Sequence, residues 1–436
     1  MDNPKKKRLK VLFYGYNGEN NTGSESRLVT IVHDVRRIFG DQFNLDMEAI
    51  TIDSAKVRRY LKDPDVRLVE LGTTWPIGLK WIPRVMRLMF KKFDFTILVE
   101  GSAFTDHFSS FLLYSQFFAA VASRIVGCKV VAYASDCGAL KPFNKKLTKR
   151  FSRLINLIIM RSNDATDRMK ELGVTKEIIT NTDTAFQYQI PLKERTDALV
   201  ARLGVDPSRP LVGLAPKEFF WWPVTIKFAG PKEDLYRFPY YHTWGPGDKE
   251  NSARVKNEFK KYADYCVNTL GATVLIFCME RMDYPPSKDI FDMLDPETQK
   301  HVRIIASNDY DLEDITGLFS RLKFLNSTRY HALVLSFIDA TPMIGVSHDA
   351  RIEALFKESS LMNYYIDYRT PDLCAVMIEK TKQLLDSEKI VRGRVTEGYI
   401  RFLERCMKNR TDLRAWFNRE LGRKFGEIPA PEKETL

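Results

Sequence analysis

The chain has 436 residues, of which 44% are hydrophobic, a fraction typical of soluble globular proteins. A single hydrophobic core rarely grows to this size, so we expect two domains. No apolar run is long enough to cross a bilayer, and residues 1–8 are not followed by the apolar segment of a signal peptide. These observations predict a cytoplasmic protein and exclude an integral membrane protein of the helical class.

The net charge of +11 predicts an anionic partner. We do not predict nucleic acid, because the basic residues are spread along the chain and no recognisable nucleic-acid-binding module is present. A phosphorylated substrate or an anionic membrane surface explains the charge as well. The six cysteines, at positions 128, 137, 266, 278, 374 and 406, contain no C-x-x-C pair. We therefore expect reduced thiols, with no disulfide framework and no metal site.

The first half of the chain alternates strand and helix patterns. Residues 10–14 predict a strand and residues 26–39 a helix capped by Ser24, with a glycine-rich turn between them. Further strands are predicted over residues 95–99, 129–134, 157–160 and 178–181. This order favours an open, mostly parallel sheet.

Residues 75–92 carry an amphipathic pattern with many basic residues. Large apolar side chains such as Trp75, Trp81 and Phe90 alternate there with Lys and Arg. Such a pattern is typical of a helix that lies on an anionic membrane, which would make the protein peripheral on the inner face of the plasma membrane. A helix that covers the N-terminal sheet is the equally weighted alternative.

A proline-containing break at residues 206–210 separates the two halves. A new series of strands follows over residues 211–214, 273–277, 302–305, 322–325 and 343–346. We therefore predict an α/β fold of two Rossmann-like domains, residues 1–205 and 206–390, that face each other across a cleft. Residues 391–436 are predicted to form charged helices and a tail that is disordered from Glu427.

The most informative stretch is residues 327–349, where polar groups follow two neighbouring strands. Arg329 and His331 are expected in the first turn of a helix, where backbone N–H groups and the guanidinium both favour an anion. Ser347, His348 and Asp349 follow the next strand. Since ligands of α/β sheets bind at the carboxyl ends of strands, this pattern predicts a site for a small, highly charged ligand.

These residues also carry a resemblance to a known family. The stretch from Arg329 to Leu333, followed by residues 341–352, resembles the Arg-x-His-Ala and Pro-x-Ile-Gly-Ile-Ser-Tyr-Asp motifs of the polysaccharide pyruvyl transferases. Five other blocks resemble the family's segments in the same order, at residues 15–25, 100–106, 129–140, 161–174 and 182–186. The order of the blocks is more specific than any one of them.

The resemblance implies an architecture similar to that of the GT-B glycosyltransferases. It also implies an enzyme, a pyruvyltransferase that uses phosphoenolpyruvate as donor, with the acceptor on residues 1–205 and the donor on residues 206–390. The pyruvyl group would form a cyclic ketal with two hydroxyls of a sugar in a polysaccharide or a lipid-linked oligosaccharide, and phosphate would be released. No cofactor and no metal are implied.

The resemblance and the chemistry together assign roles to individual residues. A donor with both carboxylate and phosphate needs several cationic or donating groups. We assign donor binding to Lys217, Arg329, Tyr330, His331, Ser347 and His348, and acceptor binding to Asn21, Gly23, Glu25, Asp106 and Trp222. His331 is predicted to be catalytic as a phosphate ligand or acid, Asp106 as a base for the hydroxyls, and Glu280 as a proton donor with a raised pKa or an acceptor ligand.

Each assignment has an ordinary structural alternative. Arg329 can pair with a structural carboxylate while His331 caps the helix, and Glu280 can form a surface ion pair with Arg281. The aromatic segment 219–247 can stack on a sugar at the cleft mouth, lie at a bilayer interface near a lipid-linked acceptor, or pack against the other domain.

Several positions depart from the family pattern. Lys217 replaces an arginine, Ser24 an aspartate and Glu100 a glycine. These changes leave open a non-catalytic protein that binds an anion. A glycosyltransferase that uses a nucleotide sugar on the same architecture is a further alternative that the sequence does not exclude.

Overall fold

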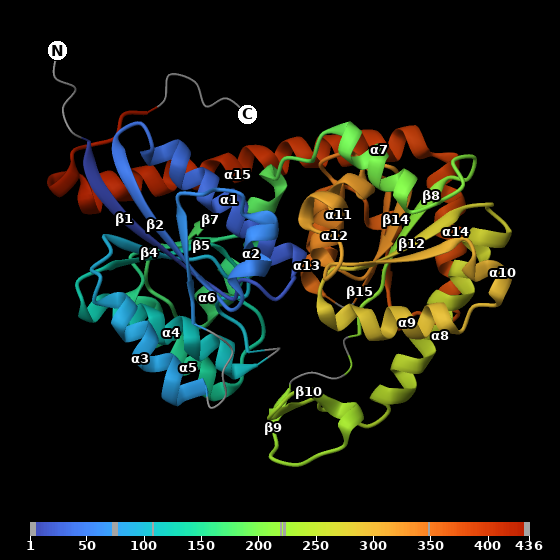
Figure 1. The fold of residues 1–436 in the computed structure, drawn as a ribbon, viewed down its shortest axis with the longest axis horizontal. Helices are drawn as coiled ribbons and strands as arrows, with labels where there is room; N and C mark the ends of the chain where they lie inside the picture. The colour runs from blue at the N-terminus through green and yellow to red at the C-terminus, as the bar shows by residue number, and fades with distance from the viewer. Residues whose placement is uncertain are drawn as a thin grey trace.

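The computed structural model describes residues 6–71, 77–106, 109–218, 220, 224–347 and 349–430. They form two α/β units that lie side by side, joined along one side by a long helix (Figure 1). Both large sheets are parallel throughout. The predicted fold class, two Rossmann-like units of GT-B type, is confirmed.

The first sheet has seven strands in the order β3-β2-β1-β4-β5-β6-β7. The strands are β1 (Lys7–Tyr14), β2 (Phe43–Thr51), β3 (Val66–Glu70), β4 (Phe95–Leu98), β5 (Lys129–Ser135), β6 (Leu157–Met160) and β7 (Ile179–Thr180). The helices that connect them are α1 (Thr22–Phe39), α2 (Ser54–Tyr60), α3 (Ile77–Met89), α4 (Ser110–Ile125), α5 (Pro142–Phe151) and α6 (Asn163–Glu171). Strands β2 and β3 are additions to the predicted set.

Both faces of this sheet are buried, which explains why its strands are nearly continuous hydrophobic runs. Along β1, Val11 and Phe13 pack toward α1, whereas Leu12 and Tyr14 pack toward α4. Helix α1 begins earlier than predicted, because Asn21 rather than Ser24 caps it: the Asn21 side chain accepts a hydrogen bond from the Ser24 N–H at 3.1 Å.

The second sheet has six strands in the order β13-β12-β8-β14-β15-β16. The strands are β8 (Leu211–Ala215), β12 (Thr273–Cys278), β13 (Val302–Ala306), β14 (Leu322–Ser327), β15 (Met343–Ser347) and β16 (Tyr365–Asp367). Its helices are α8 (Asp248–Asn268), α9 (Tyr284–Asp292), α10 (Pro296–Gln299), α11 (Leu312–Phe319), α12 (Tyr330–Ser336), α13 (Ala350–Glu358) and α14 (Leu373–Asp386).

A small antiparallel sheet projects from the second unit between β8 and α8 (Figure 1). Its strands are β9 (Thr225–Ile226), β10 (Leu235–Arg237) and β11 (Tyr240–Tyr241). It corresponds to most of the predicted aromatic segment. Residues 219 and 221–223 lie outside the described part of the chain.

Two helices tie the units together. Helix α7 (Lys193–Arg202) follows the first sheet in sequence but packs on α11 of the second unit, where Arg195 pairs with Asp311 at 2.8 Å. Helix α15 (Glu388–Phe425) runs along both units without a break (Figure 1). Phe402 stacks on Phe186 between the two units.

At its far end α15 closes the core of the first unit. Trp416 contacts Phe95 edge to face with ring centroids 5.7 Å apart, and Phe417 lies 4.8 Å from Phe39. Beyond the helix, the predicted disorder does not begin at Glu427, because Ile428 is buried and exchanges two hydrogen bonds with Asn418. Residues 431–436 lie outside the described part.

None of the described helices is both long enough and apolar enough to span a bilayer. All six cysteines are buried and unpaired.

We expect Trp416→Ala to lower the free energy of unfolding by about 3–5 kcal/mol, because it leaves a cavity where α15 meets the first sheet. Chemical denaturation followed by circular dichroism measures the change. Ile400→Ala, on an exposed site of the same helix, is the control and should shift stability by no more than about 0.5 kcal/mol. Equal effects of the two substitutions would contradict the proposed structural role of the α15 end.

Candidate active site

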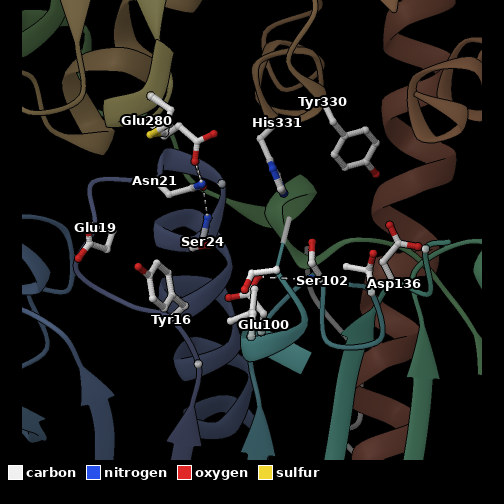
Figure 2. A pocket seen from close by; sticks show the side chains of 18 of the residues that line it. Tyr16, Glu19, Asn21, Ser24, Glu100, Ser102, Asp136, Glu280, Tyr330 and His331 are labelled. Atoms are coloured by element: carbon white, nitrogen blue, oxygen red, sulfur yellow. Dashed lines mark hydrogen bonds between the residues drawn. The ribbon is translucent and has the colours of Figure 1, made fainter. Parts of the chain in front are cut away.

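A cavity of about 590 Å³ lies between the two units and is lined by residues of both. It lies where the carboxyl ends of β1, β4 and β5 face those of β8, β12, β14 and β15, the position expected for a ligand site in parallel sheets. Figure 2 shows Glu280, Tyr330 and His331 on one side, opposite Tyr16, Ser24, Glu100 and Ser102. Its volume suits a small molecule together with part of a second one.

Arg329 lies at the carboxyl end of β14 and is already held by two carboxylates. Its Nη1 lies 2.8 Å from Glu280 Oε1, and its Nε lies 3.2 Å from Asp283 Oδ2. The structural pairing considered for Arg329 is therefore present. The partner predicted for Glu280, Arg281, is replaced by Arg329.

Glu280 also connects the two units. Its Oε2 accepts a hydrogen bond from the Asn21 side chain at 2.7 Å (Figure 2). The neighbouring Thr22 N–H donates to the Met279 carbonyl at 2.9 Å. The N-terminal end of α1 is thus fixed to the end of β12. The glycine-rich loop of the first unit and the loops that follow β12 and β14 in the second therefore share one network.

The pKa of Glu280 is lowered and not raised as predicted for a proton donor. Burial opposes its ionisation, but Arg329, Lys217 and the Asn21 hydrogen bond hold the pKa of Glu280 below its usual value, so it is a carboxylate and not a proton donor. Burial instead raises the pKa of Asp283 to about 7, although Arg329 opposes the rise. Burial and the nearby Arg329 lower the pKa of Lys217 to about 7.

His331 is wedged between the two units. Its Nε2 lies 3.6 Å from Asp183 Oδ2, and a Cβ added to Gly23 would lie 2.1 Å from its Nδ1. Glycine at position 23 is therefore required by the close approach of the imidazole to the first turn of α1. Burial lowers the pKa of His331 to about 4 despite the opposing Asp183, so the imidazole is neutral near pH 7.

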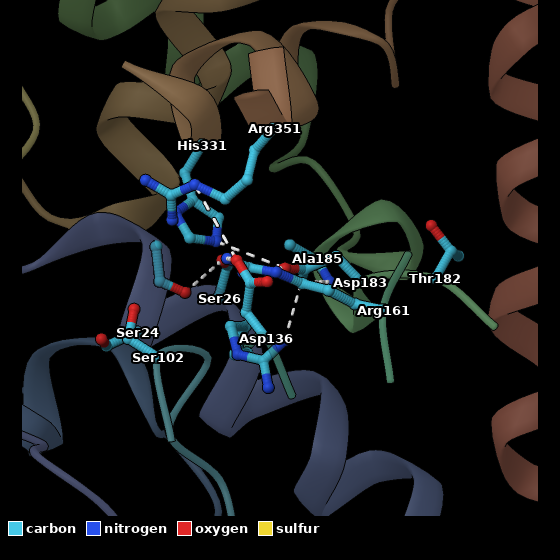
Figure 3. Close-up of polar contacts among 12 residues, drawn as sticks. Ser24, Ser26, Ser102, Asp136, Arg161, Thr182, Asp183, Ala185, His331 and Arg351 are labelled. Carbon is cyan, nitrogen blue, oxygen red and sulfur yellow. Dashed lines mark hydrogen bonds and ion pairs between the residues drawn. The ribbon is translucent and has the colours of Figure 1, made fainter. Parts of the chain in front are cut away.

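Asp183 is the centre of a buried ion-pair cluster (Figure 3). Its carboxylate lies 3.0 Å from Arg27 Nη1 and 2.7 Å from Arg161 Nη1. Burial opposes its charge, but Arg27, His331 and Arg161 hold the pKa of Asp183 well below its usual range. Arg161 continues the cluster to Asp136 at 2.6 Å.

Tyr330 and Arg351 close the cavity on the side of the second unit. The Tyr330 ring packs against two guanidinium groups, with Arg161 5.0 Å and Arg351 5.5 Å from its centroid. The Arg351 Nε donates a hydrogen bond to Asp349 Oδ1 at 2.9 Å. The same nitrogen lies 3.9 Å from Asp136 Oδ2 of the first unit. Two guanidinium groups and two carboxylates therefore meet where the units face each other.

The sequence profile of the polysaccharide pyruvyl transferase family matches residues 31–350. The chain belongs to this family. Family membership makes the protein a transferase and implies a sugar acceptor. No curated protein sequence matches the chain.

Solved structures with the same fold cover nearly the whole chain. HepE of Anabaena in complex with UDP-glucose has a TM-score of 0.61 and 12% identity, over 93% of this chain and 100% of that one. MnaA of S. aureus with UDP has a TM-score of 0.61 and 10% identity, over 98% and 100%. A putative UDP-N-acetylglucosamine 2-epimerase from Listeria monocytogenes has a TM-score of 0.59 and 11% identity, over 98% and 100%. At these identities the likeness concerns the fold alone.

The cavity of this pyruvyl transferase family member brings together most of the predicted site residues. These are Asn21, Gly23, Lys217, Glu280, Arg329, Tyr330, His331 and Ser347. Ser347 lies at the end of β15, where its hydroxyl accepts a hydrogen bond from the Asp349 N–H at 2.8 Å. His348 and Trp222 lie outside the described residues.

Two predicted site residues do not line the cavity. The Asp106 carboxylate accepts hydrogen bonds from the Lys141 N–H at 2.9 Å and from the Asn144 side chain, so it fixes the start of α5. Glu25 is buried in the first turn of α1, where burial raises its pKa to about 8 even though Arg59 is near. We assign neither residue to a ligand.

The sequence analysis missed Arg27, Asp136 and Arg161 as site residues. Asp136 and Arg161 each directly follow a strand of the first sheet, which is the one signal that could have found them. Gly101, in a family-like block, leaves room for them: a Cβ there would lie 3.0 Å from Arg161 Nη1 and 3.2 Å from Arg27 Nε.

Among the described residues, no cluster of three His, Cys, Asp or Glu side chains is placed to hold a metal ion.

We expect Gly23→Ala to lower the free energy of unfolding by about 1–3 kcal/mol, because the new methyl group overlaps the His331 imidazole. In a His331→Ala background the same substitution should cost much less. A double-mutant cycle measured by chemical denaturation gives this coupling.

Gly393→Ala is the matched control, since nothing lies within 4 Å of the added methyl group on α15. It should be neutral or stabilising, by up to about 1 kcal/mol. Equal costs of Gly23→Ala in both backgrounds would contradict the wedged position of His331.

Proposed function

We propose that the protein transfers the pyruvyl group of phosphoenolpyruvate to two hydroxyls of one sugar, with release of phosphate. The main support for the proposal is that Lys217, Arg329 and His331 line one interdomain cavity. All three lie within the residues that the family profile matches. The sugar is part of a polysaccharide or of its lipid-linked precursor.

The donor fits the charges of the second unit. Phosphoenolpyruvate carries carboxylate and phosphate on one carbon, and a guanidinium has five N–H donors. Arg329 can therefore bind one anionic group while it keeps Glu280 and Asp283. Lys217 lies in the same cluster and supplies a second positive charge when it is protonated.

The reaction requires one proton at carbon and the loss of two hydroxyl protons. Protonation of the methylene carbon gives a methyl group and leaves the adjacent carbon cationic. The first hydroxyl adds to that carbon and loses its proton, the C–O bond to phosphate breaks, and the second hydroxyl adds in its place. One hydroxyl proton replaces the proton given to carbon, and the other leaves with phosphate.

We assign these steps to residues of the cavity according to their ionisation states. Lys217, with a pKa of about 7, is the group best poised to donate a proton to carbon near neutral pH. Glu280 is a carboxylate and is suited to hold acceptor hydroxyls instead. His331 is neutral and faces Asp183, so it can take a hydroxyl proton and pass it to the departing phosphate.

Aromatic side chains give the acceptor a second wall. Tyr236, Phe238 and Tyr240 from the small antiparallel sheet line the cavity together with Tyr16 of the first unit. Aromatic rings pack against the apolar face of a pyranose and leave its hydroxyls accessible at the edge. Glu100 and Ser102 lie below the same space and can bind those hydroxyls (Figure 2).

We expect phosphoenolpyruvate to raise the melting temperature of the protein in a titration, with no comparable effect of UDP-glucose or inorganic phosphate. Arg329→Lys should remove most of the rise, since lysine keeps the charge but loses the planar fork. Arg369→Lys, at an exposed arginine paired with Asp367, is the control and should respond like the wild type.

Stabilisation by UDP-glucose alone would favour glycosyl transfer, and no response to any of the three ligands would contradict the proposed donor site. The full reaction is tested by incubation with phosphoenolpyruvate and lipid-linked or free oligosaccharides. A phosphate-release assay and mass spectrometry of the sugar then detect turnover and the ketal.

We expect the affinity for phosphoenolpyruvate to fall by about tenfold as the pH rises from about 6 to about 8. Over this range Lys217 loses its positive charge and Asp283 gains a negative one, and both changes disfavour an anion. Titration calorimetry at several pH values measures the effect.

Lys217→Arg keeps its charge over the whole range and should flatten the pH dependence. The ionisation of the ligand itself is common to both proteins and cancels in the comparison. Identical pH profiles for the two proteins would rule out Lys217 as the titrating group.

A further inference from the structure

Helices α3, α4 and α5 form one layer on the outer side of the first sheet, away from α15 (Figure 1). The layer is held together by side chains between neighbouring helices. The Tyr114 hydroxyl of α4 donates to the Asn144 side chain of α5 at 2.9 Å, and Phe117 stacks on Phe151 with centroids 4.6 Å apart. The exposed side chains of residues 82–92, 114–125 and 141–153 are called the basic face below.

The charge of the basic face has one sign. Residues 82–92 contain four Lys and Arg and residues 141–153 contain six, with no Asp or Glu in either segment, although Lys91 pairs with Glu48 of β2 at 2.8 Å. On α5, Lys145, Lys146, Lys149 and Arg150 are all exposed, and Arg84 and Arg87 are exposed on α3.

Large apolar side chains stand among these charges. Phe90 at the end of α3 and Phe143 in α5 are each 65% exposed, and Ile125 at the end of α4 is 68% exposed. Isolated exposed apolar residues are common, but here one comes from each of three adjacent helices. In the described part of the chain, no other element covers these three side chains.

We propose that the basic face docks on an anionic phospholipid bilayer. The lysines and arginines attract the negative surface, and Phe90, Ile125 and Phe143 enter the boundary between head groups and acyl chains. A purely polyanionic partner such as nucleic acid would match the charge but would leave three exposed apolar side chains without a role. The combination of both features favours the bilayer.

One of these helices, α4, also contributes to a wall of the cavity. Phe111 and Leu112, at the start of α4, line it, and so does Leu71, whose carbonyl accepts a hydrogen bond from Arg84 of the basic face. Docking would therefore bring the apolar wall of the cavity close to the bilayer. A lipid-linked sugar could then reach the cavity without leaving its membrane, a consequence that rests on the proposed function although the docking does not.

Vesicle co-sedimentation of the full chain tests the proposal without any donor or acceptor. We expect binding to vesicles of phosphatidylcholine with about one-third phosphatidylglycerol and little binding to phosphatidylcholine alone. Phe90→Ala/Phe143→Ala and, separately, Lys145→Glu/Lys146→Glu should each weaken binding by about tenfold or more.

Matched controls change the same kinds of side chain elsewhere. Leu192→Ala/Ile390→Ala removes two exposed apolar residues, and Lys382→Glu/Lys389→Glu reverses two exposed charges outside the basic face. Both control variants should bind like the wild type. Melting curves of every variant confirm that the fold is retained.

Three results would overturn the proposal. The first is failure of the wild type to bind anionic vesicles. The second is loss of binding in the controls equal to that in the basic-face variants, which would indicate attraction by net charge alone. The third is wild-type vesicle binding by the Phe90→Ala/Phe143→Ala variant together with equally tight binding to a DNA duplex, which would identify a general polyanion site.

Discussion

The carboxylate of Asp183 is completely buried and must keep its charge, and much of the structure serves that requirement. Two arginines from separate elements, Arg27 of α1 and Arg161 after β6, provide the compensating charges. Removing one partner from a buried ion pair typically costs about 3–5 kcal/mol, because the other charge remains desolvated. The positions of α1, β6 and the crossover between the units are therefore coupled through one carboxyl group.

This coupling extends into the chemistry of the cavity. Asp183 faces His331, burial keeps that imidazole neutral, and Gly23 leaves just enough room for it. In the same cavity, Arg329 keeps Glu280 ionised, while the pKa of Lys217 is lowered to about 7. A neutral base, a fixed carboxylate and a titratable amine thus coexist in a small volume, because each has a different balance of burial and neighbouring charge.

The sequence was sufficient for the features that depend on local pattern. Strand and helix periodicity predicted the two parallel sheets, and the position of Arg329 and His331 after β14 predicted their place in the cavity. The sequence did not predict ion pairs and hydrogen bonds between residues from distant parts of the chain. Nothing local indicates that Arg27 pairs with Asp183 or that Glu280 meets Arg329 rather than its neighbour Arg281. Asp106 follows a strand as expected, but its carboxylate accepts a hydrogen bond from the Lys141 N–H at the start of α5. Residue spacing in the sequence does not indicate this contact.

Because helix α15 lies at the end of the sequence, the first unit cannot complete its core until synthesis is nearly finished. Phe39 at the end of α1 and Phe95 of the first sheet are covered by Phe417 and Trp416, which the ribosome adds more than 300 residues later. At typical elongation rates of about 5–20 residues per second this delay is on the order of tens of seconds. During that time the nascent first unit exposes an aromatic surface, so its production in the cell depends on how well that surface is shielded until α15 arrives.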